Sequence, residues 1–216
     1  MARDTPAGPA KNEPVVFVVD DDEGVRDYLK WLIESVRLDV RVFATAREFL
    51  DSYDTSHPGC LLLDVRMPGL SGFDLQAELQ NRRIRLPIIM MTAYAEVPMA
   101  VRALRGGAVD FIEKPLDGQT LLDRVQAAIA TDTEARRTEQ ERQDVQGRLE
   151  RLTPRQRAVL DGLIAGKPSK VIAAELGVSP STVDVHRGRL MERLKARSLP
   201  DLFRLVLLAR QAEPLP

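Results

Sequence analysis

A single cysteine in 216 residues excludes an internal disulfide and agrees with a reducing compartment. Cys60 opens an apolar run, so we interpret it as a small buried residue. No apolar run approaches the roughly 20 residues of a membrane span. Residues 1–14 lack the apolar segment of a signal peptide and are rich in proline, alanine and glycine, which predicts a flexible tail. These absences predict a soluble, cytoplasmic protein.

The chain also has little net charge, only −1, but the charges are unevenly distributed. Residues 1–150 contain 19 Lys and Arg against 26 Asp and Glu, whereas residues 151–216 contain 12 against 6. An acidic front and a basic back indicate two units with different partners.

Between residues 15 and 130, strand patterns alternate with helix patterns. Short apolar runs bounded by polar or turn residues are typical of buried parallel strands. We expect strands at 15–19, 39–43, 61–63, 87–91 and 109–112. Helices are expected at 23–35, 45–53, 73–81, 98–105 and from 117 onward. This alternation predicts an α/β, doubly wound, five-stranded parallel sheet covered on both faces.

Reactive side chains follow several of the expected strands. Ligands of open α/β sheets bind outside the carboxyl ends of the strands, so these side chains should share one edge. Asp64 is a candidate phosphoryl acceptor, because aspartyl carboxylates can take phosphoryl groups. With Asp20 and Asp21 nearby, Asp64 needs a cation, and Mg²⁺ prefers oxygen ligands and bridges to phosphate. Lys114 would pair with a phosphate oxygen, and Thr92 offers a hydroxyl to the same group.

Four motifs in this region resemble the receiver domain of a two-component response regulator. They are VVDDD at 18–22, LDVRMPGLSG at 63–72, MTA at 91–93 and FIEKP at 111–115. The segment EVPMAV at 96–101 resembles the FixJ subgroup. The resemblance covers 15–130 and implies the flavodoxin-like strand order 2-1-3-4-5.

The resemblance also implies roles for single residues. Asp64 would be phosphorylated by a histidine kinase, and Asp20, Asp21 and the backbone carbonyl of Arg66 would hold Mg²⁺ together with Asp64. Thr92 and Phe111 would form a switch pair, and the bond between Lys114 and Pro115 would be cis. By its position in the motif, Asp22 is more typical of a helix cap than of a metal ligand.

Residues 131–150 are charged and rich in glutamine. They are either a solvated helix that extends the preceding one or a flexible linker, and their good helix formers favour the helix.

From residue 151 to 212 the pattern is purely helical, with four short helices predicted. The second and third helices are joined through a glycine, Gly177, at helix-turn-helix spacing. In such a unit the second helix of the pair enters the DNA major groove. The candidate residues on that helix are Ser181, Thr182, Asp184, Val185, His186, Arg187 and Arg189. From spacing and charge alone, a small protein-binding helical domain remains an alternative.

The sequences LTPRQ at 152–156, IAAEL at 172–176 and STVDVH at 181–186 resemble the LuxR/NarL-type DNA-binding domain. That resemblance implies phosphate contacts from Lys170, Thr182, His186 and Arg187. It implies base contacts from Asp184, Val185, Gly188 and Arg189. Two residues depart from the family pattern on this helix. Many relatives carry Lys where Asp184 stands, and a glycine such as Gly188 costs a helix about 1 kcal/mol relative to alanine. His186 could equally be a satisfied helix histidine, and Gly188 could simply be tolerated.

The sequence therefore predicts a phosphorylation-activated DNA-binding transcriptional regulator that uses Mg²⁺. Its expected partners are a cognate histidine kinase, double-stranded DNA and, when phosphorylated, a second copy of the chain. We expect no enzymatic activity beyond its own phosphotransfer and dephosphorylation. The alternatives are a receiver-linked adaptor that binds a protein, and a phosphatase acting on small substrates.

Overall fold

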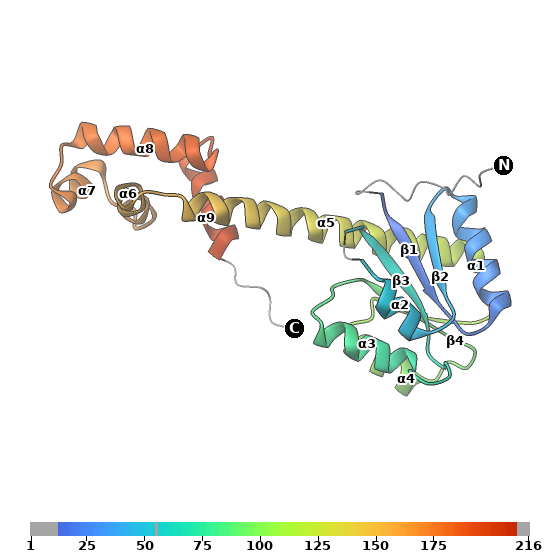
Figure 1. Ribbon diagram of the computed structural model, residues 1–216. Coiled ribbons are helices and arrows are strands. Elements are labelled where there is room, and N and C mark those ends of the chain that lie inside the picture. Colours follow the sequence, from blue (N-terminus) through green and yellow to red (C-terminus); the bar gives the residue numbers. More distant parts are fainter. Residues whose placement is uncertain (1–12, 55, 211–216) are drawn as a thin grey trace. The chain divides into compact units, whose positions relative to one another are not determined.

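The computed structural model describes residues 13–54 and 56–210 (Figure 1). The chain divides after Arg136 into an N-terminal unit and a C-terminal unit, which are described separately. Most of the predicted tail at 1–14 lies outside the described residues. None of the helices in the described ranges is long and apolar enough to cross a membrane.

The N-terminal unit contains a five-stranded parallel sheet in the order β2-β1-β3-β4-β5, which confirms the predicted topology. The strands are β1 (Val15–Val19), β2 (Asp39–Phe43), β3 (Gly59–Asp64), β4 (Ile88–Thr92) and β5 (Asp110–Glu113). The helices are α1 (Glu23–Ser35), α2 (Ala46–Ser52), α3 (Gly72–Asn81), α4 (Val97–Arg105) and the first part of α5 (Gly118–Glu150).

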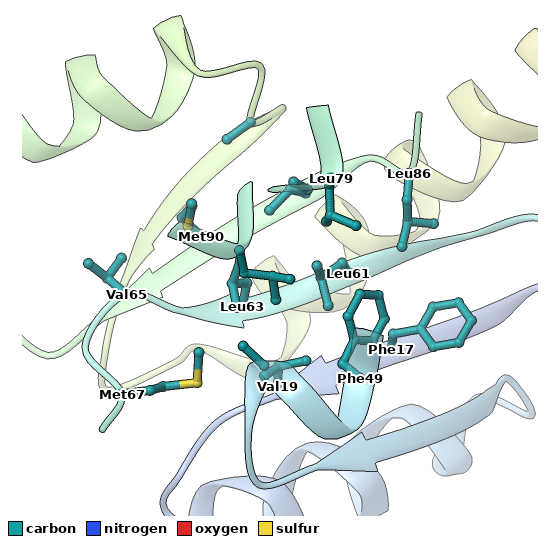
Figure 2. Close-up of a cluster of buried hydrophobic side chains, with 14 of the residues drawn as sticks. Phe17, Val19, Phe49, Leu61, Leu63, Val65, Met67, Leu79, Leu86 and Met90 are labelled. Atoms are coloured by element: carbon teal, nitrogen blue, oxygen red, sulfur yellow. The ribbon is translucent and has the colours of Figure 1, made fainter. Parts of the chain in front are cut away.

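Helices cover both faces of the sheet, and strand β1 shows why. Phe17 points with Val15 and Val19 into a cluster shared with α2, α3 and α4 (Figure 2). Val16 and Val18 point to the opposite face, into a cluster shared with α1 and α5. Successive strand residues face opposite sides, so an uninterrupted apolar strand is buried on both faces. Cys60 is fully buried, as its apolar neighbours predicted.

Strand β3 begins at Gly59, two residues earlier than the apolar run predicted. A Cβ atom at this position would lie 1.9 Å from the carbonyl oxygen of Val15, so only glycine fits against β1. Glycine has little intrinsic preference for strands, and the sequence pattern therefore placed it outside.

The C-terminal unit is helical. Its helices are the second part of α5, then α6 (Pro154–Ile164), α7 (Ser169–Leu176), α8 (Pro180–Leu194) and α9 (Leu199–Arg210). Residues 131–150 are thus helical throughout. Val145 and Leu149, at the end of that stretch, are buried in the same cluster as Val159, Val183 and Leu190. The core of this unit therefore includes residues that the sequence assigned to the linker.

Helix α8 ends at Leu194, because Lys195 has a left-handed backbone with φ 56°. The amide of Lys195 donates to the carbonyl oxygens of the last turn, which caps the helix.

Candidate functional site

Lys114 joins two carboxylates at the carboxyl edge of the sheet. Its Nζ lies 2.6 Å from Oδ2 of Asp20 and 2.6 Å from Oδ1 of Asp64. Asp20 follows β1, Asp64 ends β3 and Lys114 follows β5, so three strand ends meet as the sequence predicted. Asp20 and Asp64 are buried, with 1% and 5% of their surface exposed.

Backbone amides bind the remaining carboxylate oxygens. Asp22 donates its N–H to Oδ1 of Asp20 at 3.0 Å, and Arg66 donates its N–H to Oδ2 of Asp64 at 2.6 Å. The side chain of Asp22 instead accepts the amide of Val25 and caps α1, in agreement with its predicted role. Both buried carboxylates are therefore held in fixed orientations.

The charges at this edge do not balance, because two buried carboxylates face one ammonium. Burial raises the pKa of Asp20 above its ordinary value, and the charge of Asp64 adds to the rise, although Lys114 opposes it. Burial alone would lower the pKa of Lys114, but its bonds to the two carboxylates outweigh this effect and raise the pKa. The excess negative charge is chemically suited to a hard cation such as Mg²⁺.

The third predicted metal ligand, Asp21, is exposed. Arg26 binds the backbone next to it, donating from Nη1 to the carbonyl oxygens of Asp20 at 2.8 Å and of Asp21 at 2.9 Å. Within the described ranges, no three His, Cys, Asp or Glu side chains are gathered closely enough to hold a metal ion. The donor chemistry thus suits Mg²⁺, while the complete ligand set remains a prediction.

Thr92 is buried and ends β4. Because β4 lies between β3 and β5, Thr92 lies between the strand ends that carry Asp64 and Lys114. Its carbonyl oxygen accepts the amide of Lys114 at 2.7 Å, and its Oγ1 lies 3.3 Å from both the N and the O of Tyr94. Phe111 lies on β5, half-buried against the α2–α3–α4 side of the core. The bond between Lys114 and Pro115 is cis, as the resemblance implied.

In the C-terminal unit, α7 and α8 are joined by a tight turn. Gly177 has φ 63°, a left-handed conformation that glycine adopts without strain, and it ends α7. Ser179 then caps α8 by accepting the amide of Thr182 at 3.2 Å. Val183, Leu190 and Leu194 bury one face of α8 in the core of the unit.

The side of α8 opposite this buried face is exposed to solvent. The exposed residues there are Ser181, Asp184, Val185, Arg187, Gly188 and Arg189, while Thr182 and His186 are partly exposed. Lys170 is exposed on α7. All nine predicted DNA-contacting residues are thus accessible on this helix pair.

Two of these residues have informative surroundings. The carboxylate of Asp184 accepts the hydroxyl of Ser169, on α7, at 3.1 Å. A Cβ atom added at Gly188 would meet no described heavy atom within 4 Å, so packing inside the unit does not require a glycine there.

Comparison with known proteins agrees with both units. A model of the response regulator receiver domain matches residues 16–126, and a model of the luxR family of bacterial regulatory proteins matches residues 150–206. Nodulation protein W of Bradyrhizobium diazoefficiens is 44% identical over 196 residues, which cover 91% of this chain and 86% of that protein. The transcriptional regulatory protein FixJ of Azorhizobium caulinodans is 43% identical over 194 residues, covering 90% and 92%.

The chain is a response regulator of the FixJ/NarL family. The solved structure of the response regulator StyR is similar to it, with a TM-score of 0.82 and 40% identity over 90% of this chain and 98% of that chain. A receiver domain followed by a LuxR-type DNA-binding domain is the organisation of a two-component transcription regulator. Its partners are accordingly a kinase and DNA.

Sequence reasoning missed Arg26 in this response regulator. Its guanidinium fixes the backbone of the acidic loop, and Arg26 is half-buried although it is charged. An available signal was the spacing, because Arg26 lies in the first turns of the helix that directly follows three aspartates. An arginine there can reach back to the carbonyl groups that precede the helix.

Proposed function

We propose that Asp64 accepts a phosphoryl group from a cognate histidine kinase, and that the phosphorylated chain binds double-stranded DNA and regulates transcription. The observation that supports this proposal best is the placement of Lys114 within 2.6 Å of both Asp20 and Asp64. A buried carboxylate beside a cation is suited to receive an anionic group. As a DNA-binding regulator, the chain would act in the cytoplasm.

In the proposed step, a carboxylate oxygen of Asp64 forms a bond to phosphorus while the bond from phosphorus to the kinase histidine breaks. Lys114 would transfer part of its pairing from Asp64 to an oxygen of the phosphoryl group. Mg²⁺, held by Asp20, Asp21, Asp64 and the carbonyl of Arg66, would offset the charge of the transferred group. Thr92 would donate its hydroxyl to that group, and Phe111 would move with it as the second member of the switch.

The chain would not be an enzyme toward other substrates. The reaction ends on its own carboxylate, and hydrolysis of that acyl phosphate resets the switch.

The phosphorylated chain would pair with a second copy of itself. Three apolar residues of α4 support such pairing, because Val97, Val101 and Leu104 are 78%, 42% and 51% exposed and recur at helical spacing.

In the DNA-bound state, α8 would enter the major groove. Lys170, Thr182, His186 and Arg187 would contact phosphates, while Asp184, Val185, Gly188 and Arg189 would face bases. Ser181 begins the exposed face of the same helix.

The test combines labelling with DNA selection. Wild-type protein incubated with acetyl phosphate and Mg²⁺ should be labelled at residue 64, and Asp64→Asn should not. DNA selected from random sequence should bind the labelled wild type more tightly than the unlabelled protein. Persistent labelling of Asp64→Asn would contradict the acceptor assignment. Absence of DNA affinity in both states would favour a protein-binding adaptor.

A further inference from the structure

Helix α5 carries a buried charged residue where it leaves the receiver domain. Its earlier turns pack on the sheet through Leu121, Val125 and Ala128. Asp132 follows Ala128 by four residues and so continues the same face of the helix. Only 4% of Asp132 is exposed. A carboxylate at the end of an apolar stripe needs specific partners, because burying an unpaired charge is costly.

Asp132 has two such partners. Its Oδ2 accepts the amide of Gly59, 73 residues earlier in the chain, at 2.9 Å. The same oxygen lies 2.6 Å from Nε of Arg136, one turn further along α5. Arg136 also hydrogen-bonds with Tyr53, next to the end of α2. The helix is therefore connected to the base of the sheet through polar contacts after its apolar contacts end.

The other partner of this contact, Gly59, belongs to the strand that carries Asp64. Gly59 begins β3 and Asp64 ends it, about 16 Å apart at the usual rise of about 3.3 Å per strand residue. Gly59 pairs with Val15 of β1, and a Cβ atom at Gly59 would lie 1.9 Å from the carbonyl oxygen of Val15, so the two backbones are closely packed there. The amide that binds Asp132 thus belongs to a closely packed part of the sheet.

A polar contact of this kind fixes rotation better than an apolar one. Apolar side chains can slide past one another, whereas a buried carboxylate that loses its donor pays the full cost of desolvation. Buried polar groups are best known for specifying register in helical assemblies. Residues 133–144 of α5 are almost entirely polar and provide no apolar stripe that could set the rotation of the helix.

We propose that Asp132 is a positioning residue that fixes the rotation of α5 as the helix leaves the receiver domain, and that this anchor couples the state of the receiver to DNA binding. The inference rests on the proposed function. Asp132 acts through Gly59 and Arg136 and takes no part in the phosphoryl transfer at Asp64.

The experiment uses the full-length chain, with Asp132→Ala and a matched control. Asp123→Ala removes an exposed carboxylate of the same helix, whose contact is a hydrogen bond from Gln119. The first readout is hydrogen exchange of the Gly59 amide, which should become faster in Asp132→Ala and remain unchanged in Asp123→Ala. The second is the rate at which acetyl phosphate with Mg²⁺ labels Asp64, which should be unchanged in both variants.

The deciding readout is the ratio of DNA affinities with and without phosphorylation, measured on a duplex selected with the phosphorylated wild type. We expect Asp132→Ala to lower this ratio at least about fivefold, the lower end of ordinary coupling between sites. A purely structural role would change both affinities or the folded fraction and leave the ratio intact. If Asp132→Ala does not fold, Asp132→Asn and Arg136→Gln serve instead, with smaller reductions expected.

The proposal would be overturned if Asp132→Ala speeds exchange of the Gly59 amide but leaves the ratio of DNA affinities with and without phosphorylation at its wild-type value. The proposed function fails differently, because the wild-type chain itself would then show no labelling or a ratio of one.

Discussion

The ammonium of Lys114 lies 2.6 Å from a carboxylate oxygen of Asp64, although 50 residues separate them in the chain. Strand β4 lies between β3, which ends at Asp64, and β5, which Lys114 follows, so the lysine side chain crosses the end of β4, beside Thr92, to reach Asp64. It also reaches Asp20, so one ammonium serves two buried carboxylates. This arrangement favours function over stability, as expected where like charges are held together.

Asp20→Asn should stabilise the unphosphorylated chain. The pKa of Asp20 is raised, mainly by burial, so its ionisation destabilises the folded state as pH rises above the ordinary value of 3.8. We expect the free energy of unfolding near neutral pH to rise by about 0.5–2 kcal/mol, the usual range for a stabilising substitution. The gain should shrink as pH falls and wild-type Asp20 takes up its proton. Urea denaturation across this pH range measures it, with exposed Asp27→Asn as the control; a loss of stability near neutral pH would contradict the assignment.

Lys114→Met should have the opposite effect. Removing the ammonium leaves two buried carboxylates without their cation, and breaking a buried ion pair typically costs about 3 kcal/mol or more. Urea denaturation should show a smaller loss in the Asp20→Asn background, where only one carboxylate remains charged. Lys30→Met, on the exposed surface of α1, is the matched control. Equal losses in both backgrounds would mean that Lys114 does not serve both carboxylates.

The sequence predicted the residues at the strand ends because two local facts were sufficient. An apolar run shows where a buried strand ends, and parallel strands bring such ends to one edge, so Asp20, Asp64, Thr92 and Lys114 followed directly. The order of the strands came from the receiver motifs. The recognition helix followed in the same way from Gly177 and the helical patterns on either side of it.

Contacts between distant polar residues were not predictable in this way. Asp132 meets the amide of Gly59 across 73 residues, and neither residue belongs to a periodic pattern that reveals the other. Gln76 is buried on α3 because its amide meets a carbonyl of α4, although glutamine is usually exposed. Such pairs depend on how separate elements pack against one another. The residue pattern within a single helix does not reveal that packing.

Substitutions at Gln76 and Gly106 should partly compensate for each other's loss of stability. Nε2 of Gln76 donates to the carbonyl oxygen of Ala103 at 2.9 Å, and a Cβ atom at Gly106 would lie 2.6 Å from Oε1 of Gln76. We expect Gly106→Ala to cost about 1–3 kcal/mol by overpacking. Gln76→Ala should cost about 0.5–1.5 kcal/mol, because it removes one hydrogen bond from a carbonyl that keeps the amide of Ala108 as its other donor. The double variant should cost less than the sum, because the clash is gone.

Thermal or urea denaturation of the four proteins completes this cycle. Gly147→Ala is the control, because its Cβ would meet no described atom within 4 Å and the helix should gain up to about 1 kcal/mol. Strict additivity of Gln76→Ala and Gly106→Ala would show that the two side chains do not compete for the same space.

Asp184→Asn should change which base the protein prefers. The carboxylate is exposed on α8 and can accept a hydrogen bond from cytosine N4, whereas an asparagine amide both donates and accepts and pairs well with adenine. Asparagine can keep the contact with Ser169 through its amide oxygen, so the helix pair should remain intact. We expect DNA selection to shift one position of the bound site from cytosine toward adenine, with discrimination of about 1–3 kcal/mol.

The salt dependence of binding separates this effect from a change in phosphate attraction. Asp184→Asn should leave the slope of affinity against salt unchanged, since it removes no cation. Lys170→Ala should weaken binding to all sequences alike and reduce the slope by about 1, the value expected for one lost phosphate contact. An unchanged selected sequence in Asp184→Asn would place this carboxylate outside the base contacts. A change in base preference in Lys170→Ala would show that the lysine contacts bases, because phosphate contacts carry no sequence information.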